Sequence, residues 1–251
     1  MHNTASARIN ITALRDNLAV VRRICPHSRI LAMVKADAYG HGLLPVAAAL
    51  DAADGFAVAR LQEALALRSA GIAKRIVLLG TLLDAADLVV CSERHIDVTA
   101  HDESSVSSIV SHVKGMPLRV WLKLDSGMHR IGLNLDDFVA ADRLLSGHSG
   151  VLELIHMSHF SSPGHGSTTV MEQQVSRFWA CHKASSPAMV SLANSAALIA
   201  IPETHADWVR PGIMLQWTRC FYWGAALRVA TEWSQCPPYT PIFRLQALGS
   251  G

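Results

Sequence analysis

The sequence predicts an α/β fold, a (β/α)8 barrel of the TIM type, on three observations. Short β-like runs alternate with amphipathic helical runs between residues 12 and 212, with a repeat of about 25 residues. Eight such units in about 200 residues match the usual size of this barrel. Unusual polar residues follow several different strands, whereas a doubly wound open sheet, the alternative, would collect its ligand motif at one switch point.

The eight expected strands are apolar or β-branched runs. They span residues 30–34, 55–59, 75–79, 96–100, 118–124, 152–158, 188–193 and 207–210. Their alternation with helices implies parallel pairing through right-handed crossovers. A further alternating run, residues 7–11, precedes the first helix and has no partner in the barrel pattern.

In the expected helices the apolar residues recur with a period near 3.6, and all but the first helix follow a barrel strand. The first is expected to have Thr12 as its N-cap and Leu14, Leu18 and Val21 on one face. The others span residues 43–50, 61–70, 84–90, 103–113, 136–145 and 168–183, and a short one starts at Ser195.

Composition excludes several classes of protein. The chain has 251 residues, of which 50% are hydrophobic and 17% charged, so it can bury a large core and is not expected to be disordered. A net charge of +2 gives no reason to expect nucleic acid or an anionic membrane as a partner. No apolar run approaches the roughly 18 residues of a spanning helix, and the polar N-terminus carries no secretory signal.

The five cysteines have neither the close spacing of a zinc site nor the even number of a disulfide framework. This usage indicates a reducing compartment, so a cytoplasmic location is expected.

The composition changes after Leu215. Residues 216–251 contain three basic residues, Arg219, Arg228 and Arg244, and a single acidic one, Glu232. Tryptophan, tyrosine and cysteine are also concentrated in this segment. We therefore expect residues 1–215 to form the barrel and residues 216–251 to form a divergent tail.

The densest cluster of chemically useful residues is AMVKADAYGHG, residues 32–42. Lys35 closes an apolar strand, and burial of its stem lowers the pKa of the amine, which suits Schiff-base chemistry. An isolated lysine there would more often extend to water. Here Tyr39 follows four residues later, and Gly40 and Gly42 allow the backbone to approach a ligand closely. The cluster indicates a site for an anion or a carbonyl compound.

The same string resembles the cofactor-lysine signature of the alanine racemase family. The members of this family are barrel enzymes that depend on pyridoxal 5'-phosphate. Further strings agree in order along the chain: FAVA at 56–59, LKLDSGMHRIG at 122–132, MSHF at 157–160, NSA at 194–196 and DWVRPGI at 207–213. The resemblance covers residues 7–215.

The resemblance implies a site for pyridoxal 5'-phosphate. Lys35 would bond covalently to the cofactor and act as one of two catalytic bases. Arg210 would meet the pyridine nitrogen, and His159 would lie near the ring. Arg130 would bind the phenolic oxygen, supported by Lys123, which is carbamylated in some members of the family. The phosphate would be held by Tyr39, Ser195 and the amides of Gly212 and Ile213, with Asn194 beside them, which agrees with the usual barrel phosphate site after strands 7 and 8.

Taken singly, several of these residues have ordinary structural interpretations. Ser195 could cap a helix, Gly212 could form a turn after a proline, and Arg210 could make a surface ion pair. His159 could be a hydrogen-bonded core histidine. His156 and His159 lie three apart on a strand and therefore face opposite sides, so no metal site is expected there.

The activity implied by the resemblance is interconversion of L-alanine and D-alanine for cell-wall synthesis, in a homodimer. After Leu215 the family continues with Tyr-Gly and a second, β-rich domain that supplies the second base, a tyrosine, to the partner's site. This chain reads QWTRC at residues 216–220 instead. We expect a tail that is out of frame, or a short ending packed on the barrel, and in either case residues 7–11 as an unpaired edge strand.

Three hypotheses of function follow. The chain is an impaired racemase, a non-catalytic barrel that holds pyridoxal 5'-phosphate, or an inactive racemase fragment.

Overall fold

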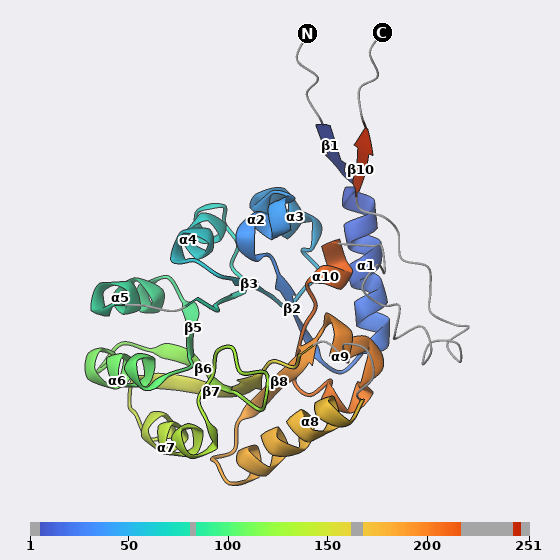
Figure 1. Ribbon diagram of the computed structural model, residues 1–251. Helices are drawn as coiled ribbons and strands as arrows, with labels where there is room; N and C mark the ends of the chain where they lie inside the picture. The colour runs from blue at the N-terminus through green and yellow to red at the C-terminus, as the bar shows by residue number, and fades with distance from the viewer. Residues whose placement is uncertain (1–5, 81–83, 162–167, 217–242, 247–251) are drawn as a thin grey trace.

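The computed structural model describes residues 6–80, 84–161, 168–216 and 243–246. Eight parallel strands close into a barrel in chain order, which confirms the predicted (β/α)8 fold (Figure 1). The strands are β2 (Arg29–Met33), β3 (Gly55–Val58), β4 (Arg75–Leu78), β5 (Ile96–Ala100), β6 (Leu118–Leu124), β7 (Val151–Ser158), β8 (Met189–Asn194) and β9 (Trp208–Arg210).

Helices surround the barrel, as Figure 1 shows. They are α1 (Ile11–Ile24), α3 (Leu43–Ala49), α4 (Leu61–Ser69), α5 (Ala85–Glu93), α6 (Glu103–His112), α7 (Leu135–Ser146), α8 (Thr168–Lys183) and α9 (Ser195–Ala200). Shorter turns of helix are α2 (Lys35–Gly40), η1 (Pro202–Thr204) and α10 (Ile213–Gln216). One apolar layer fills the space between the strands and these helices. A second fills the barrel interior with Leu31, Met33, Ala57, Val77, Trp121, Ile155, Met157 and Trp208.

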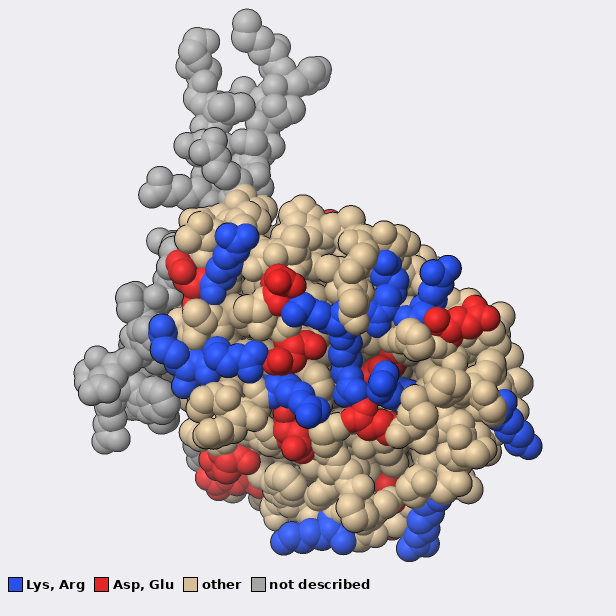
Figure 2. Space-filling view, turned by 180° about the vertical axis from the view of Figure 1, so that it is seen from behind, with Lys and Arg blue, Asp and Glu red and all other residues tan. Residues whose placement is uncertain are grey.

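Ion pairs and an aromatic pair close the amino-terminal end of the barrel. Arg75 contacts Asp97 at 3.3 Å and Glu153 at 2.5 Å, and Trp121 Nε1 donates to Asp97 at 3.0 Å. The guanidinium of Arg75 also lies over the ring of Trp208. Figure 2 shows basic and acidic side chains gathered across the middle of that face. Because this end is filled, a ligand site belongs at the other end.

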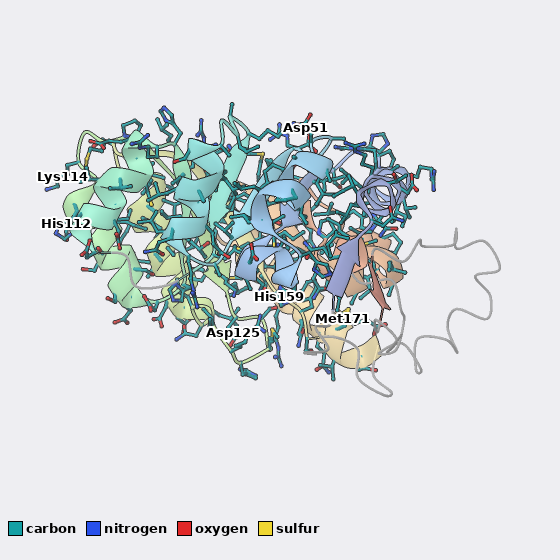
Figure 3. The ribbon with its side chains drawn as sticks, turned by 90° about the horizontal axis from the view of Figure 1, so that it is seen from above. Asp51, His112, Lys114, Asp125, His159 and Met171 are labelled. Carbon is teal, nitrogen blue, oxygen red and sulfur yellow. The ribbon has the colours of Figure 1, made fainter. Side chains whose placement is uncertain are left out.

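The opposite end carries the loops that follow the strands. In Figure 3, Asp125 and His159, which follow β6 and β7, lie on one side of the barrel. Asp51 and Lys114, which precede β3 and β6, lie on the other side. The two rims of the barrel are therefore distinct, and the polar residues singled out in the sequence belong to the rim of Asp125 and His159.

The start of the chain differs from the expectation in two respects. Helix α1 is capped by Asn10, whose side chain accepts from Ala13 N at 3.1 Å, so Thr12 lies inside the helix and is not its N-cap. Strand β1 (Ser6–Ile9) pairs antiparallel with β10 (Phe243–Gln246), which corrects the prediction of an unpaired edge (Figure 1). The partner strand could not be found by pattern because it lies more than two hundred residues away.

The predicted boundary at residue 215 falls inside helix α10. Gln216 is buried and donates to Met33 O at 2.7 Å, and Asn17 donates to Leu215 O at 3.0 Å. The proposed tail otherwise lies mostly outside the described residues. Within the described part of the chain, no helix has the length and apolar character needed to cross a membrane.

Candidate active site

Five basic side chains meet at the rim formed by the carboxyl ends of the strands. Lys35 follows β2, Lys123 lies in β6, Arg130 follows β6, His159 follows β7, and Arg210 ends β9. Burial and the other four cations together lower the pKa of His159 to about 2, so its imidazole is neutral. Burial, followed by Arg210, Arg130 and Lys35, lowers the pKa of Lys123 to about 8. Such a concentration of positive charge favours an anionic ligand.

Lys35 is half-buried at the start of α2. Burial lowers the pKa of its amine, Arg130 lowers it further, and the negative charge of Glu63 acts in the opposite direction. A lowered pKa increases the fraction of neutral amine at neutral pH, and only the neutral form attacks a carbonyl carbon or accepts a proton.

The chain after Lys35 forms a left-handed turn. Ala36, Asp37, Ala38 and Tyr39 all have φ of 52° or 53°, a region that residues other than glycine seldom occupy. The turn directs the chain back over the barrel end, where Tyr39 contacts the segment after β9. Sequence reasoning predicted a close backbone approach here but placed it at the glycines.

A backbone cradle joins the turn to the last strands. Ser195 Oγ accepts from the amides of Gly212 at 3.0 Å and Met214 at 3.3 Å. A β-carbon at Gly212 would lie 2.6 Å from Tyr39 Oη and 3.0 Å from the β-carbon of Met33. Only glycine fits this position, so Gly212 is required for the approach of Tyr39 rather than for a turn alone.

Asn194, not Ser195, caps α9. Its Oδ1 accepts from Ala196 and Ala197 at 3.1 and 3.0 Å, and its Nδ2 donates to Phe160 O at 3.0 Å. The cap leaves the hydroxyl of Ser195 directed at the Gly212 segment. The amide of Ile213 begins α10, and its side chain is 48% exposed.

Arg210 is buried at the end of β9, with 3% of its surface exposed. It donates to Ser191 Oγ at 2.6 Å and to the carbonyl oxygens of Ser158 and Leu192. Burial lowers the pKa of its guanidinium to about 10, so the group stays protonated at neutral pH. Three neutral oxygens therefore hold Arg210 as a buried, fixed cation, in place of the surface ion pair that the residue type alone would suggest.

The loop after β6 carries Arg130 to the mouth of the barrel, where its side chain is exposed. Asp125 Oδ1 shapes this loop by accepting from the amides of Gly127, Met128 and His129 at 2.9 to 3.0 Å. Buried Gln174 of α8 donates to Gly127 O and to Ser161 Oγ, both at 3.0 Å. It thereby ties this loop to the segment after β7.

His156 faces away from the site. Its Nε2 lies 2.8 Å from Asp142 Oδ1, and its Nδ1 lies 2.9 Å from His182 Nδ1. Ser186 donates to the second oxygen of Asp142 through its amide and its hydroxyl. This chain of buried hydrogen bonds joins β7 to α7 and α8, and it agrees with the prediction that His156 and His159 point in opposite directions.

Several residues that shape the site carried no visible motif of their own. Ser191 holds Arg210, Asp125 shapes the Arg130 loop, Gln174 joins two loops, and Glu63 contacts the Lys35 turn. The available signal for Glu63 was its place in the first turn of the helix after the FAVA strand. Ser191 and Gln174 act through tertiary contacts that no local pattern shows, whereas Asp125 binds amides two to four residues ahead in its own loop.

The fold and the site together define a class: a parallel barrel whose rim carries a half-buried lysine, a cluster of basic side chains and loops after its last strands, an arrangement suited to an anionic ligand. The sequence matches the family described as alanine racemase, N-terminal domain, over residues 9–219. The chain therefore belongs to the alanine racemase N-terminal domain family.

Similar proteins agree with this family. Alanine racemase from Yersinia pestis bv. Antiqua (strain Angola) is 42% identical over 212 residues, 84% of this chain and 59% of that protein. Alanine racemase from Aeromonas hydrophila subsp. hydrophila is 42% identical over 214 residues. The crystal structure of biosynthetic alanine racemase from Pseudomonas aeruginosa superimposes with a TM-score of 0.86 at 35% identity, covering 97% of this chain and 66% of that one. The chain thus spans about 59% of the length of the curated relatives it matches.

Proposed function

We propose that this chain binds pyridoxal 5'-phosphate through Lys35 and acts on alanine as a racemase of reduced efficiency. The observation that carries the proposal is the contact of Tyr39 with Gly212, because it joins the lysine turn to a backbone cradle at one end of the barrel. The family membership of the chain supports the choice of cofactor and substrate.

The residues present fit the cofactor. The hydroxyls of Tyr39 and Ser195 and the amides of Gly212 and Ile213 are donors of the kind that hold a phosphate. Arg130 and Lys123 supply positive charge for a phenolate, and Arg210 offers a fixed guanidinium to a ring nitrogen. The four cations at this rim, Lys35, Lys123, Arg130 and Arg210, suit a ligand that carries several negative charges.

Each proposed catalytic step belongs to a residue of the chain. The bound cofactor supplies an electron sink that acidifies the Cα proton of the amino acid. Lys35 Nζ, as a neutral amine, accepts the Cα proton on the face it occupies and returns it there. Arg210 holds its protons and accepts none, so it stabilises charge without transferring a proton. His159 is neutral and offers a hydrogen bond without adding charge.

Racemisation needs an acid–base group on each face of Cα. Lys35 serves one face, and the resemblance places the second base in a part of the relatives beyond the match. A positioned acid–base group contributes about 10²- to 10⁴-fold to rate, so we expect inversion by the 251-residue chain to be slower by a comparable factor. Exchange of the Cα proton with solvent should then outpace inversion.

The test compares exchange with inversion directly. Purified protein is incubated with pyridoxal 5'-phosphate and D-alanine in deuterated water, and proton NMR measures loss of the Cα proton while chiral chromatography measures L-alanine. We expect exchange to exceed inversion and Lys35→Ala to abolish both. Equal rates of exchange and inversion, at a rate normal for the relatives, would show that the chain has a second base.

The second candidate is a non-catalytic carrier of the same cofactor. The supporting observation is that every residue proposed to bind the cofactor belongs to the barrel, which this chain contains. Bound cofactor without exchange would favour the carrier, and absence of binding would favour an inactive fragment. Cytoplasmic location, dimerisation and supply of D-alanine to peptidoglycan remain part of the proposal.

A further inference from the structure

Glu63 connects α4 to the turn that follows Lys35. Its Oε1 accepts from Asp37 N at 3.0 Å, and its Oε2 accepts from Ala59 N at 3.0 Å and Arg60 N at 3.1 Å. One carboxylate thus binds three amides in two segments. Asp37 is the second residue of the left-handed turn.

The contact with Asp37 goes beyond helix capping. The carboxylates of Asp84 and Asp102 cap α5 and α6, and each accepts from an amide three residues ahead in its own helix. Glu63 instead reaches 26 residues back along the chain. A residue that served only to start α4 would need the bonds to Ala59 and Arg60 alone.

The turn needs such support. Four consecutive residues other than glycine occupy the left-handed region, which L-residues adopt singly rather than in runs. A strained backbone persists only where surrounding contacts over-determine it. Ala38 N donates to Val34 O at 2.9 Å and Asp37 Oδ1 accepts from Leu43 N at 2.7 Å, so two contacts within the local segment hold the middle of the turn. Glu63 adds a contact to Asp37 N from another helix.

Glu63 also supplies negative charge near the Lys35 amine. Among the described residues, four charged or titratable groups on other elements interact electrostatically with Lys35: Arg130, Lys123, His159 and Glu63. On its own turn lie Asp37, whose side chain is bound to Leu43, and Tyr39. Of the two charges with a resolved effect on the Lys35 amine, Arg130 favours its neutral form and Glu63 its charged form.

We propose that Glu63 is a positioning residue for Lys35: it pins the left-handed turn that places Lys35 and Tyr39, and it balances the cations around the amine. Its consequence for cofactor binding rests on the proposed function, whereas its effect on Lys35 is a property of the cofactor-free protein.

The first experiment measures charge in the cofactor-free protein. Competitive labelling with trace acetic anhydride between pH 6 and 11, followed by peptide mass spectrometry, gives the reactivity midpoint of each lysine. Glu63→Gln should move the midpoint of Lys35 to lower pH and leave those of Lys74 and Lys114 unchanged. Asp84→Asn is the matched control, because it makes the same carboxylate-to-amide change at the next helix start and should leave Lys35 unaffected.

The second experiment measures geometry by rescue. The protein is incubated with increasing concentrations of pyridoxal 5'-phosphate, the cofactor on Lys35 is fixed with borohydride, and the adduct is quantified. Glu63→Gln should raise the cofactor concentration needed for half-saturation about tenfold, which is the effect of losing one charge-assisted hydrogen bond. Ala36 is exposed and left-handed, so Ala36→Gly relieves the turn without loss of packing. Ala36→Gly should restore affinity in the Glu63→Gln protein and have a smaller effect in the unmodified one.

A further variant distinguishes the effect of the negative charge from the effect of side-chain length, and it serves as the test if Glu63→Gln does not fold. Glu63→Asp keeps the charge on a shorter side chain, so it should retain the Lys35 midpoint, lose affinity and be rescued by Ala36→Gly.

An unchanged Lys35 midpoint in folded Glu63→Gln, or the absence of rescue by Ala36→Gly, would overturn the proposal. If the unmodified chain forms no Lys35 adduct, the proposed function fails, while the labelling experiment still decides the role of Glu63.

Discussion

The hydroxyl of Tyr39 lies against the α-carbon of Gly212, so close that a β-carbon there would be 2.6 Å from the oxygen. The two residues are 173 positions apart in the chain, and the contact joins the turn after the first barrel strand to the segment after the last. Because Ser195 Oγ also accepts from the amide of Gly212, the segment has little freedom to withdraw. The proposed phosphate cradle therefore depends on the absence of a side chain at one residue.

Gly212→Ala should weaken binding of pyridoxal 5'-phosphate by about tenfold or more, because the methyl group displaces either Tyr39 or the backbone amides. Fluorescence titration with the cofactor measures the effect. Gly147→Ala is the control, since its nearest neighbour beyond the local chain would be Arg143 O at 3.7 Å, an ordinary contact. Equal affinities for the two variants would contradict the proposed cradle.

Arg210→Lys should destabilise the cofactor-free protein by about 1–3 kcal/mol, measured by urea denaturation. A lysine ammonium cannot reproduce the planar guanidinium that reaches Ser191 Oγ and the carbonyl oxygens of Ser158 and Leu192. Ser191→Ala removes one of these acceptors and should cost about 0.5–1.5 kcal/mol. A fully stable Arg210→Lys protein would show that the three bonds do not hold the side chain.

Lys123→Met should stabilise the cofactor-free protein at pH 7, on the order of 1 kcal/mol because the side chain keeps some contact with water. Burial and neighbouring cations lower the pKa of Lys123 from 10.5 to about 8. Between these values the unfolded chain binds more protons than the folded one, so stability from this group rises with pH. The advantage of the variant should shrink from pH 8 to pH 10. A constant difference across that range would contradict the lowered pKa.

Asp142→Asn should destabilise the protein by about 2–4 kcal/mol at pH 7, because it disrupts a buried carboxylate bonded to His156 and Ser186. Burial raises the pKa of Asp142, but the hydrogen bonds from His156 and Ser186 together outweigh it, so the pKa is lowered overall. Its contribution is therefore present above the unfolded pKa and is lost as the pH falls through the folded one. Asp136→Asn, at an exposed position of the same helix, is the control in denaturation curves at pH 7 and at about pH 2.5, below the unfolded pKa. An equal loss of unfolding free energy at both pH values would contradict the stabilising role of the Asp142 carboxylate.

The helices of the barrel were predictable because each buries one stripe, which gives its apolar residues a period near 3.6. The strands were predictable because burial on both faces makes them short continuous apolar runs. The turn over Ala36 to Tyr39 was not, since alanine and tyrosine give no local signal for a left-handed backbone and aspartate adopts it only as a single residue. The pairing of β1 with β10 was missed for a related reason: strand pairing at long range depends on where the chain travels.

At the candidate site, the sequence indicated the residue types that we expect to contact a ligand and missed the residues that hold them in place. Asn194 and Ser195 show the difference. Both residue types cap helices, and only the path of the chain determines that Asn194 caps α9 while Ser195 binds Gly212. Ser191 and Gln174 act across the fold, and Glu63 makes one of its three bonds to a residue 26 positions earlier, so these contacts follow from the fold and not from neighbours in sequence.

The most direct test of the account is the covalent capture of pyridoxal 5'-phosphate. The full chain is incubated with the cofactor, reduced with borohydride, digested and mapped by mass spectrometry, with Lys35→Ala and Lys123→Met treated in parallel. The account predicts an adduct on Lys35 that persists in the Lys123 variant and disappears in the Lys35 variant. An adduct spread over surface lysines such as Lys74 and Lys114, with no preference for Lys35, would contradict it.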